Sequence, residues 1–181
     1  MAAAVREGAW SLVVAAEHAP ATFLASGVLT DSEATVSTSG TGGRVRALVE
    51  LKAVTGGLRP RAMLGGEFVP EQGTELSFEV DHSGALGLGA ATTCPSLIGG
   101  SSLVAGLPTE FAQAVLDGLV RVKCATTTPA GVLHIDRAGH DEVDSSQMVF
   151  ERAAGLLRCV LAAAVGGVVL DEESLRELLR G

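Results

Sequence analysis

Apolar residues at helical spacing dominate the C-terminal part of this sequence. They fall three or four positions apart and stop before Gly166 and Gly167: Val149, Ala153, Leu156, Val160 and Ala164. This spacing predicts one apolar face of an α-helix, and paired glycines are typical of the end of a helix. A helix with one apolar face has to bury that face against a sheet or against another helix.

The start of this helix has a pattern of its own. Asp144 and Gln147 are placed as an N-terminal capping pair, and Val143 and Met148 as the hydrophobic staple around it. Capping explains the run Asp144–Ser146, so a catalytic role for these residues is the weaker interpretation. We therefore expect Asp144 and Gln147 to be structural.

A second helix is expected after Pro108, because proline suits the first turn of a helix. Its apolar positions share one face: Phe111, Val115, Leu119 and Val122. Gly118 lies inside this helix, where glycine is unfavourable. It therefore indicates close packing against a neighbouring strand. A third, charged helix is expected over Glu172–Arg180.

Alternating and β-rich runs predict the strands. Polar and apolar residues alternate over Val45–Val54 and Glu75–Val80, as in half-buried strands. Further strands are expected over Gly131–Asp136 and Val168–Leu170, and within residues 1–40, where Trp10–Ala16 and Phe23–Leu29 are apolar.

Glycine-rich segments predict the connections. Ser37–Gly43 lies between two β-rich runs and is expected to be a hairpin tip. Residues 55–75 hold several glycines and prolines and are expected to form turns. Residues 83–106 show little periodicity and are expected to form a loop or lid. The chain is thus predicted to be an α+β protein with a small mixed sheet and two main helices on one face.

Composition limits the compartment and the partners. Cys94, Cys124 and Cys159 are odd in number and far apart, which indicates neither a disulfide framework nor a zinc site. Reduced cysteines and a cytoplasmic location are therefore expected.

The net charge of −8 disfavours DNA as a partner, because nucleic-acid binding depends on many basic contacts. The most apolar stretch, Cys159–Leu170, is shorter than the roughly 20 residues of a membrane span. No membrane partner is expected.

Three segments carry a resemblance to a known family. Residues 133–154 read Leu-His-Ile-Asp-Arg-Ala-Gly-His-Asp-Glu-Val-Asp-Ser-Ser-Gln-Met-Val-Phe-Glu-Arg-Ala-Ala, and residues 105–118 contain Leu-Pro-Thr-Glu-Phe-Ala-Gln-Ala-Val. Together with Thr41-Gly-Gly-Arg44, they resemble the fourth domain of elongation factor G. The resemblance covers about residues 41–170 and implies the ribosomal protein S5 domain 2-like fold. Residues 1–40 are then a β-rich extension, separate or part of the same domain, and residues 171–181 a terminal helix.

The resemblance also implies a binding site. In the family, a strand runs into a tip loop that carries a histidine and reaches RNA in the ribosome. Loops 40–46 and 137–142 are therefore expected to lie side by side, with four residues available to RNA or another partner: Arg44, Arg46, Arg137 and His140. His140 stands one residue away from the position of the family's histidine. The motif G-x-x-x-x-G-K-[ST] does not occur in the sequence, so no GTPase activity is expected.

Three functions follow as hypotheses. The first is a stand-alone translation-factor-like domain that binds the ribosome, tRNA or a translation partner. The second is an enzyme on the same fold with a substrate loop at 83–103, although no residue indicates catalysis: Cys94 and Cys124 have no nearby base, and the histidines lack metal-ligand spacing. The third is a scaffold that forms homo-oligomers through its apolar surface. Neither a cofactor nor a metal is expected.

Overall fold

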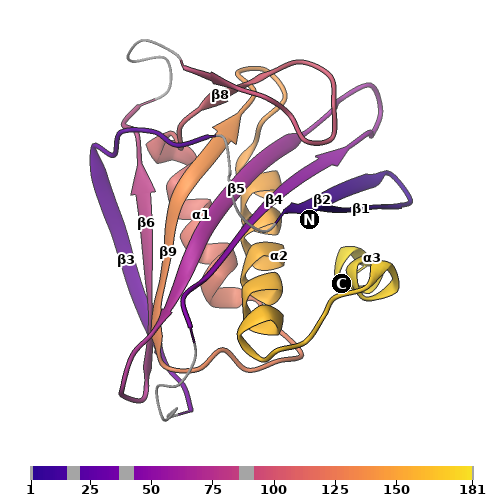
Figure 1. The fold of residues 1–181 in the computed structure, drawn as a ribbon. Helices are drawn as coiled ribbons and strands as arrows, with labels where there is room; N and C mark the ends of the chain where they lie inside the picture. The colour runs from indigo at the N-terminus through magenta and orange to yellow at the C-terminus, as the bar shows by residue number, and fades with distance from the viewer. Residues whose placement is uncertain (1, 16–20, 37–42, 86–91, 181) are drawn as a thin grey trace.

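The computed structural model describes residues 2–15, 21–36, 43–85 and 92–180 (Figure 1). Their strands form one sheet in the order β1-β2-β4-β5-β9-β6-β3, and the short pair β7–β8 joins the sheet through β9. The strands are β1 (Ala2–Glu7), β2 (Trp10–Ala15), β3 (Gly27–Ala34), β4 (Val45–Ala53), β5 (Arg61–Pro70), β6 (Glu75–His82), β7 (Thr93–Cys94), β8 (Leu103–Ala105) and β9 (Gly131–His140). β6 and β9 run parallel, and the other paired strands run antiparallel.

Three helices accompany this sheet in the described residues: α1 (Thr109–Arg121), α2 (Gln147–Val165) and α3 (Glu172–Arg180). Figure 1 shows α1 and α2 side by side across one face of the sheet, with α3 near the edge formed by β1 and β2. The main core lies between this face and the two helices. The α+β class with two main helices on one face is therefore confirmed.

Gly118 explains how closely α1 and α2 approach each other. A Cβ at this position would overlap the backbone carbonyl group of Glu151 in α2. The prediction of close packing is confirmed, but the neighbour is a helix and not a strand. The predicted apolar face of α1 is buried at Val115 and Leu119, whereas Val122 already lies beyond the end of the helix.

Several other boundaries agree with the sequence patterns. Strands β4 and β6 lie where alternation placed them, the charged helix α3 lies where it was expected, and α2 ends before Gly166, as expected. The expected strand at Val168–Leu170 is wrong, because these residues have no regular structure. Residues 2–34 contribute β1, β2 and β3 to the same sheet as the rest of the chain.

The prediction of turns over residues 55–75 is wrong in its central part. Strand β5 occupies Arg61–Pro70 and pairs with β4 on one side and with β9 on the other. Its glycines, Gly65 and Gly66, lie at a shift in register between β5 and β9. A Cβ on Gly66 would overlap the carbonyl group of His134, so this strand needs glycine at that point.

The expected hairpin tip is also in the wrong place. β3 pairs with β6, whereas β4 pairs with β2 and β5, so β3 and β4 do not form a hairpin. Residues 37–42 of the expected tip lie outside the described residues. The hairpin is formed by β4 and β5, which are joined by Gly56 and Gly57 with φ values of 56° and 87°. Both glycines thus adopt the left-handed conformations that tight hairpin turns require.

A disulfide joins Cys124, beyond the end of α1, to Cys159 in α2, with 5.1 Å between their Cα atoms. The expectation that the chain forms no disulfide is therefore wrong. Cys94 is free and buried. None of the described helices is both long enough and apolar enough to span a membrane.

Candidate functional site

The four residues expected at one tip lie in two separate places. β9 continues through Arg137 and His140, so these residues belong to a strand and not to a loop. Arg46 pairs with Glu67, which faces His134 on β9, and His140 lies six positions further along that strand. At the usual rise of a β-strand, this separates Arg46 from His140 by roughly 20 Å. For the described part of these segments, residues 43–46 and 137–142, the prediction that they lie side by side is wrong.

The three arginines are paired with acidic groups. Arg44 and Arg46 both lie beside Glu67, with nitrogen–oxygen distances of 3.6 and 2.8 Å. The guanidinium group of Arg137 is 3.5 Å from Asp136. These carboxylates offset much of the positive charge that a phosphate-binding patch would need.

His140 is buried on the helix-covered face of the sheet. Its Nδ1 is 3.2 Å from the carbonyl oxygen of Gly106, and its ring meets the ring of Phe111 edge-on at 6.4 Å. Only 5% of the residue is exposed, so it is not available to RNA in this conformation.

The start of α2 differs from the predicted cap. Ser146 is the N-cap, and its hydroxyl group accepts a hydrogen bond from the backbone N–H of Val149. Asp144 is therefore not the cap, and Gln147 donates instead to the carbonyl oxygen of Glu110. The hydrophobic staple is wrong as well, because Val143 and Met148 are 87% and 64% exposed.

Asp141 organises the turn that precedes this helix. Its carboxylate accepts the backbone N–H groups of Val143 and Asp144. Burial acts to raise the pKa of Asp141, but these two hydrogen bonds and the nearby charge of Arg61 hold the pKa below its ordinary value.

Residues 83–106 were expected to form a loop or lid. In the described part of this segment, hydrogen bonds hold residues 96–101 against the sheet. Glu50 of β4 is fully buried and accepts hydrogen bonds from the Ser96 hydroxyl and from the backbone N–H groups of Leu97 and Ile98. Arg61 of β5 lies 3.2 Å from Glu50 and donates to Ser101. These bonds satisfy the hydrogen-bonding capacity of the buried carboxylate. We therefore interpret Glu50 as a residue that stabilises the fold.

Cys94 lies in the small core beneath this segment. It packs with Leu48, Met63 and Leu103 on the face of the sheet opposite to α1 and α2. Burial and the negative charge of Glu50 raise the pKa of the Cys94 thiol, although Arg61 acts in the other direction. A buried thiol with a raised pKa is a poor nucleophile at neutral pH.

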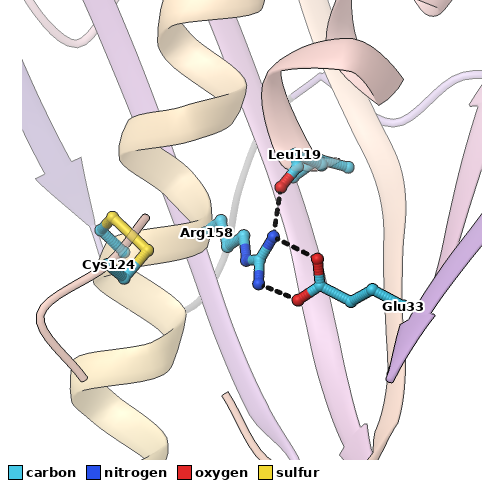
Figure 2. The surroundings of a disulfide bond; sticks show 5 residues. Glu33, Leu119, Cys124 and Arg158 are labelled. Atoms are coloured by element: carbon cyan, nitrogen blue, oxygen red, sulfur yellow. Dashed lines mark hydrogen bonds and ion pairs between the residues drawn. A yellow bond between two sulfur atoms is a disulfide. The ribbon is translucent and has the colours of Figure 1, made fainter. Parts of the chain in front are cut away.

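A groove of about 750 Å³ lies between the end of α1, the exposed side of α2 and the segment that leads into α3. Most of its lining is apolar, including Met148, Leu156, Val168, Leu170 and Leu178, and the disulfide forms part of its wall. Figure 2 shows Cys124 against the side of α2. The volume lies within the range of ligand-binding pockets.

Charged groups of both signs surround the groove. Arg121 pairs with Glu151 at 2.9 Å, and Arg152 lies over the Trp10 ring at 4.4 Å. Burial lowers the pKa of Arg152. Lys123 and Glu177 also line the groove, and neither makes an ion pair with the described part of the chain.

Sequence reasoning missed this groove. Met148 was assigned to a staple and Val168 to a strand, although both are exposed groove residues. The cysteines lie 35 positions apart, a separation that identifies no pair by itself. Only the fold brings these elements together.

Two histidine contacts lie elsewhere on the molecule. His134 is 3.2 Å from Asp81 across β9 and β6, and His82 is 3.1 Å from the hydroxyl group of Thr109. Within the described ranges, no group of three acidic, histidine or cysteine side chains could hold a metal ion.

No protein-family model and no curated protein matches the sequence. The functional proposal therefore rests on the groove.

Proposed function

We propose that this protein is a binding module that holds an apolar segment of a partner protein in the groove between α1, α2 and α3. The observation that carries the proposal is the mostly apolar groove of about 750 Å³ that residues of all three helices line. Grooves of this kind accept amphipathic helices, whose apolar side chains enter while their polar face stays in water.

The exposed apolar surface favours a protein over a small molecule. Met148 and Val168 line the groove and are 64% and 49% exposed, and the neighbouring Val169 points largely to solvent. Apolar surface that continues beyond a pocket is typical of protein–protein contacts. A small ligand enclosed in the groove would leave Val169 uncovered.

The rim suits a segment that carries charges of both signs. Lys123 and Glu177 are without ion-pair partners in the described structure, and they can pair with acidic and basic side chains of an amphipathic helix. Such rim pairs contribute little affinity, but they favour one orientation of the bound segment.

The order of elements supports a relationship with the fourth domain of elongation factor G. The hairpin β4–β5 is followed by β6, the short pair β7–β8, α1, β9 and α2. Apart from β7–β8, this is the succession of hairpin, strand, helix, strand and helix that the resemblance implies, with the hairpin at β4–β5 in place of the expected Ser37–Gly43. The S5 domain 2-like fold and a role in translation are part of this proposal. The ribosome is therefore the first assembly in which to look for the partner.

Photo-crosslinking tests the groove directly. A photoreactive phenylalanine analogue replaces Met148 in one protein and Val143 in another, because Val143 is more exposed than Met148 but lies outside the groove. Each protein is irradiated with an extract of its source cells and with purified ribosomes. We expect protein crosslinks from position 148, their loss when Val168→Glu is added, and few crosslinks from position 143.

The other outcomes identify the alternatives. Crosslinks to RNA, lost in an Arg44→Ala/Arg46→Ala/Arg137→Ala variant, would favour RNA contact over the groove. Crosslinks between two copies of this chain would favour an oligomeric scaffold. Equal crosslinking from positions 143 and 148, or no protein crosslink from position 148, contradicts the groove proposal.

A further inference from the structure

The disulfide occupies a specific place in the groove. Cys124 and Cys159 both line it, one from the segment after α1 and the other from the middle of α2 (Figure 2). The bond therefore ties one wall of the groove to the other.

The segment that carries Cys124 has little else to hold it. Within the described part of the chain, residues 123–127 make no hydrogen bond and no ion pair. The next hydrogen bond along the chain joins the Thr35 hydroxyl to the carbonyl oxygen of Thr128. Thr126 packs near Gly166, and the disulfide is the covalent restraint on this wall.

The two sulfur atoms differ in their surroundings. Cys159 is 7% exposed within a packed helix, whereas Cys124 is more exposed and lies in irregular structure on the groove. A thiolate in solution therefore reaches the Cys124 sulfur more easily than the Cys159 sulfur. The third cysteine, Cys94, lies in the small core on the other face of the sheet, where it cannot compete in this exchange.

We infer that Cys124 and Cys159 form a thiol–disulfide exchange site that opens and closes the wall of the groove, with Cys124 as the sulfur that is attacked. The reductant is a dithiol, either a small molecule or a protein. Its first thiolate bonds to the Cys124 sulfur while the Cys124–Cys159 bond breaks, and Cys159 leaves as a thiolate and takes up a proton.

The second thiol of the reductant completes the reaction. As a thiolate, it attacks its own partner sulfur in the mixed disulfide and releases Cys124, which also takes up a proton. The protein gains two electrons and two protons, and the reductant becomes a disulfide. Residues 123–127 then lose their covalent restraint.

The consequence for binding rests on the proposed function. A groove whose wall is held in place binds its partner without having to order that wall first, so breaking the disulfide weakens binding. The redox chemistry itself does not depend on any partner, and it is tested separately.

Alkylation and mass spectrometry of the full chain test whether the pair forms. Of the three cysteines, only Cys94 should be alkylated in denaturant after oxidation, and all three after reduction with dithiothreitol. Three alkylated cysteines under both conditions would overturn the inference.

Trapping of the mixed disulfide tests which sulfur reacts. In Cys159→Ser, oxidised glutathione should form one adduct at Cys124, at least about ten times faster than any adduct at Cys94, because exposure governs exchange. Cys124→Ser is the matched variant, and its buried Cys159 should react more slowly than Cys124. Equal rates at Cys124 and Cys159 would contradict the assigned direction of attack.

Limited proteolysis tests the effect on the wall. Reduction should accelerate trypsin cleavage after the exposed Lys123 at least about tenfold, since a locally released segment fits a protease without global unfolding. Cleavage after the buried Arg61 of β5 should be unchanged and serves as the internal control. If the disulfide forms but cleavage after Lys123 stays the same after reduction, the site does not control the groove.

Crosslinking from position 148 connects the two proposals. Its yield should fall after reduction of the wild-type cysteines and should be insensitive to dithiothreitol in Cys124→Ser. If position 148 never crosslinks while reduction still releases residues 123–127, the proposed function fails and the exchange site stands. If crosslinking occurs equally before and after reduction, the partner binds but the disulfide does not regulate it.

Discussion

Arg158 of α2 forms an ion pair with Glu33 of the edge strand β3 (Figure 2). The same guanidinium group donates to the carbonyl oxygen of Leu119 at the end of α1 and lies 5.1 Å from the centre of the Phe78 ring. One side chain thus links the edge of the sheet to both main helices. The Arg158 side chain thus lies between β3, α1 and α2 and packs against Phe78 of the main core.

Removing the carboxylate should destabilise the protein. We expect Glu33→Ala to lower the free energy of unfolding by about 2 kcal/mol, because it leaves the buried Arg158 without its counter-charge while partial exposure of Glu33 limits the loss. Urea unfolding measures the change. Glu71→Ala, at an exposed position without an ion pair in the described structure, is the control and should remain within about 0.5 kcal/mol of wild type. Equal stability of the two variants would show that the ion pair contributes nothing.

The N-cap of α2 gives a second prediction. Ser146→Ala should lower the free energy of unfolding by about 1 kcal/mol, because the N–H of Val149 loses its acceptor. Asp144→Ala should change it by less than about 0.5 kcal/mol, since Asp144 contributes no side-chain cap. Thermal unfolding of both variants distinguishes the two positions, and a larger effect at Asp144 would restore the cap expected from the sequence.

Asp141 gives a prediction about pH. Its folded-state pKa lies below the ordinary value of 3.8, so the stability that its carboxylate contributes is complete above that value and disappears as pH falls through the folded pKa. Asp141→Asn should therefore be less stable than wild type at pH 7, by about 1 kcal/mol. The difference should shrink below pH 3.8.

Urea midpoints at several pH values measure this difference. Asp144→Asn is the control, because its side chain accepts neither of the two backbone N–H groups held by Asp141. A difference between Asp141→Asn and wild type that persists unchanged into strong acid would contradict the assigned role.

The contact between α1 and α2 gives a fourth prediction. Gly118→Ala should lower the free energy of unfolding by at least about 2 kcal/mol, because the new methyl group overlaps the backbone of Glu151 and forces the helices apart. Alanine's higher helix propensity offsets about 1 kcal/mol of that strain.

Gly155→Ala is the matched control in the facing helix. A Cβ there would lie 3.4 Å from Val122, an ordinary contact, so this variant should be as stable as wild type or more stable. Both changes replace glycine with alanine inside a helix, so denaturant unfolding isolates the effect of the close approach. Similar results for the two variants would show that the helices separate easily.

Periodicity along the sequence was sufficient for the elements whose burial follows a local pattern. Helices α1 and α2 and strands β4 and β6 were predicted near their observed positions, since apolar residues recur at the period of each element. The glycine pair at 166 and 167 also predicted the end of α2.

Local signals failed where backbone contacts with distant strands decide the structure. Gly65 and Gly66 suggest a turn when read alone, but in β5 they allow the close approach of β9. The same strand pairing carries β9 through Arg137 and His140 and buries the histidine that the family resemblance placed in a loop.

The sequence alone therefore determined helices α1 and α2 and strands β4 and β6, because the apolar positions of these elements repeat every two to four residues. The tertiary structure alone decided which strands are neighbours, which basic residues meet acidic partners, and that Cys124 reaches Cys159. These contacts join residues far apart in the chain, and no local spacing encodes them. The groove belongs to this second class, because three helices and a disulfide build it only after the sheet has brought them together.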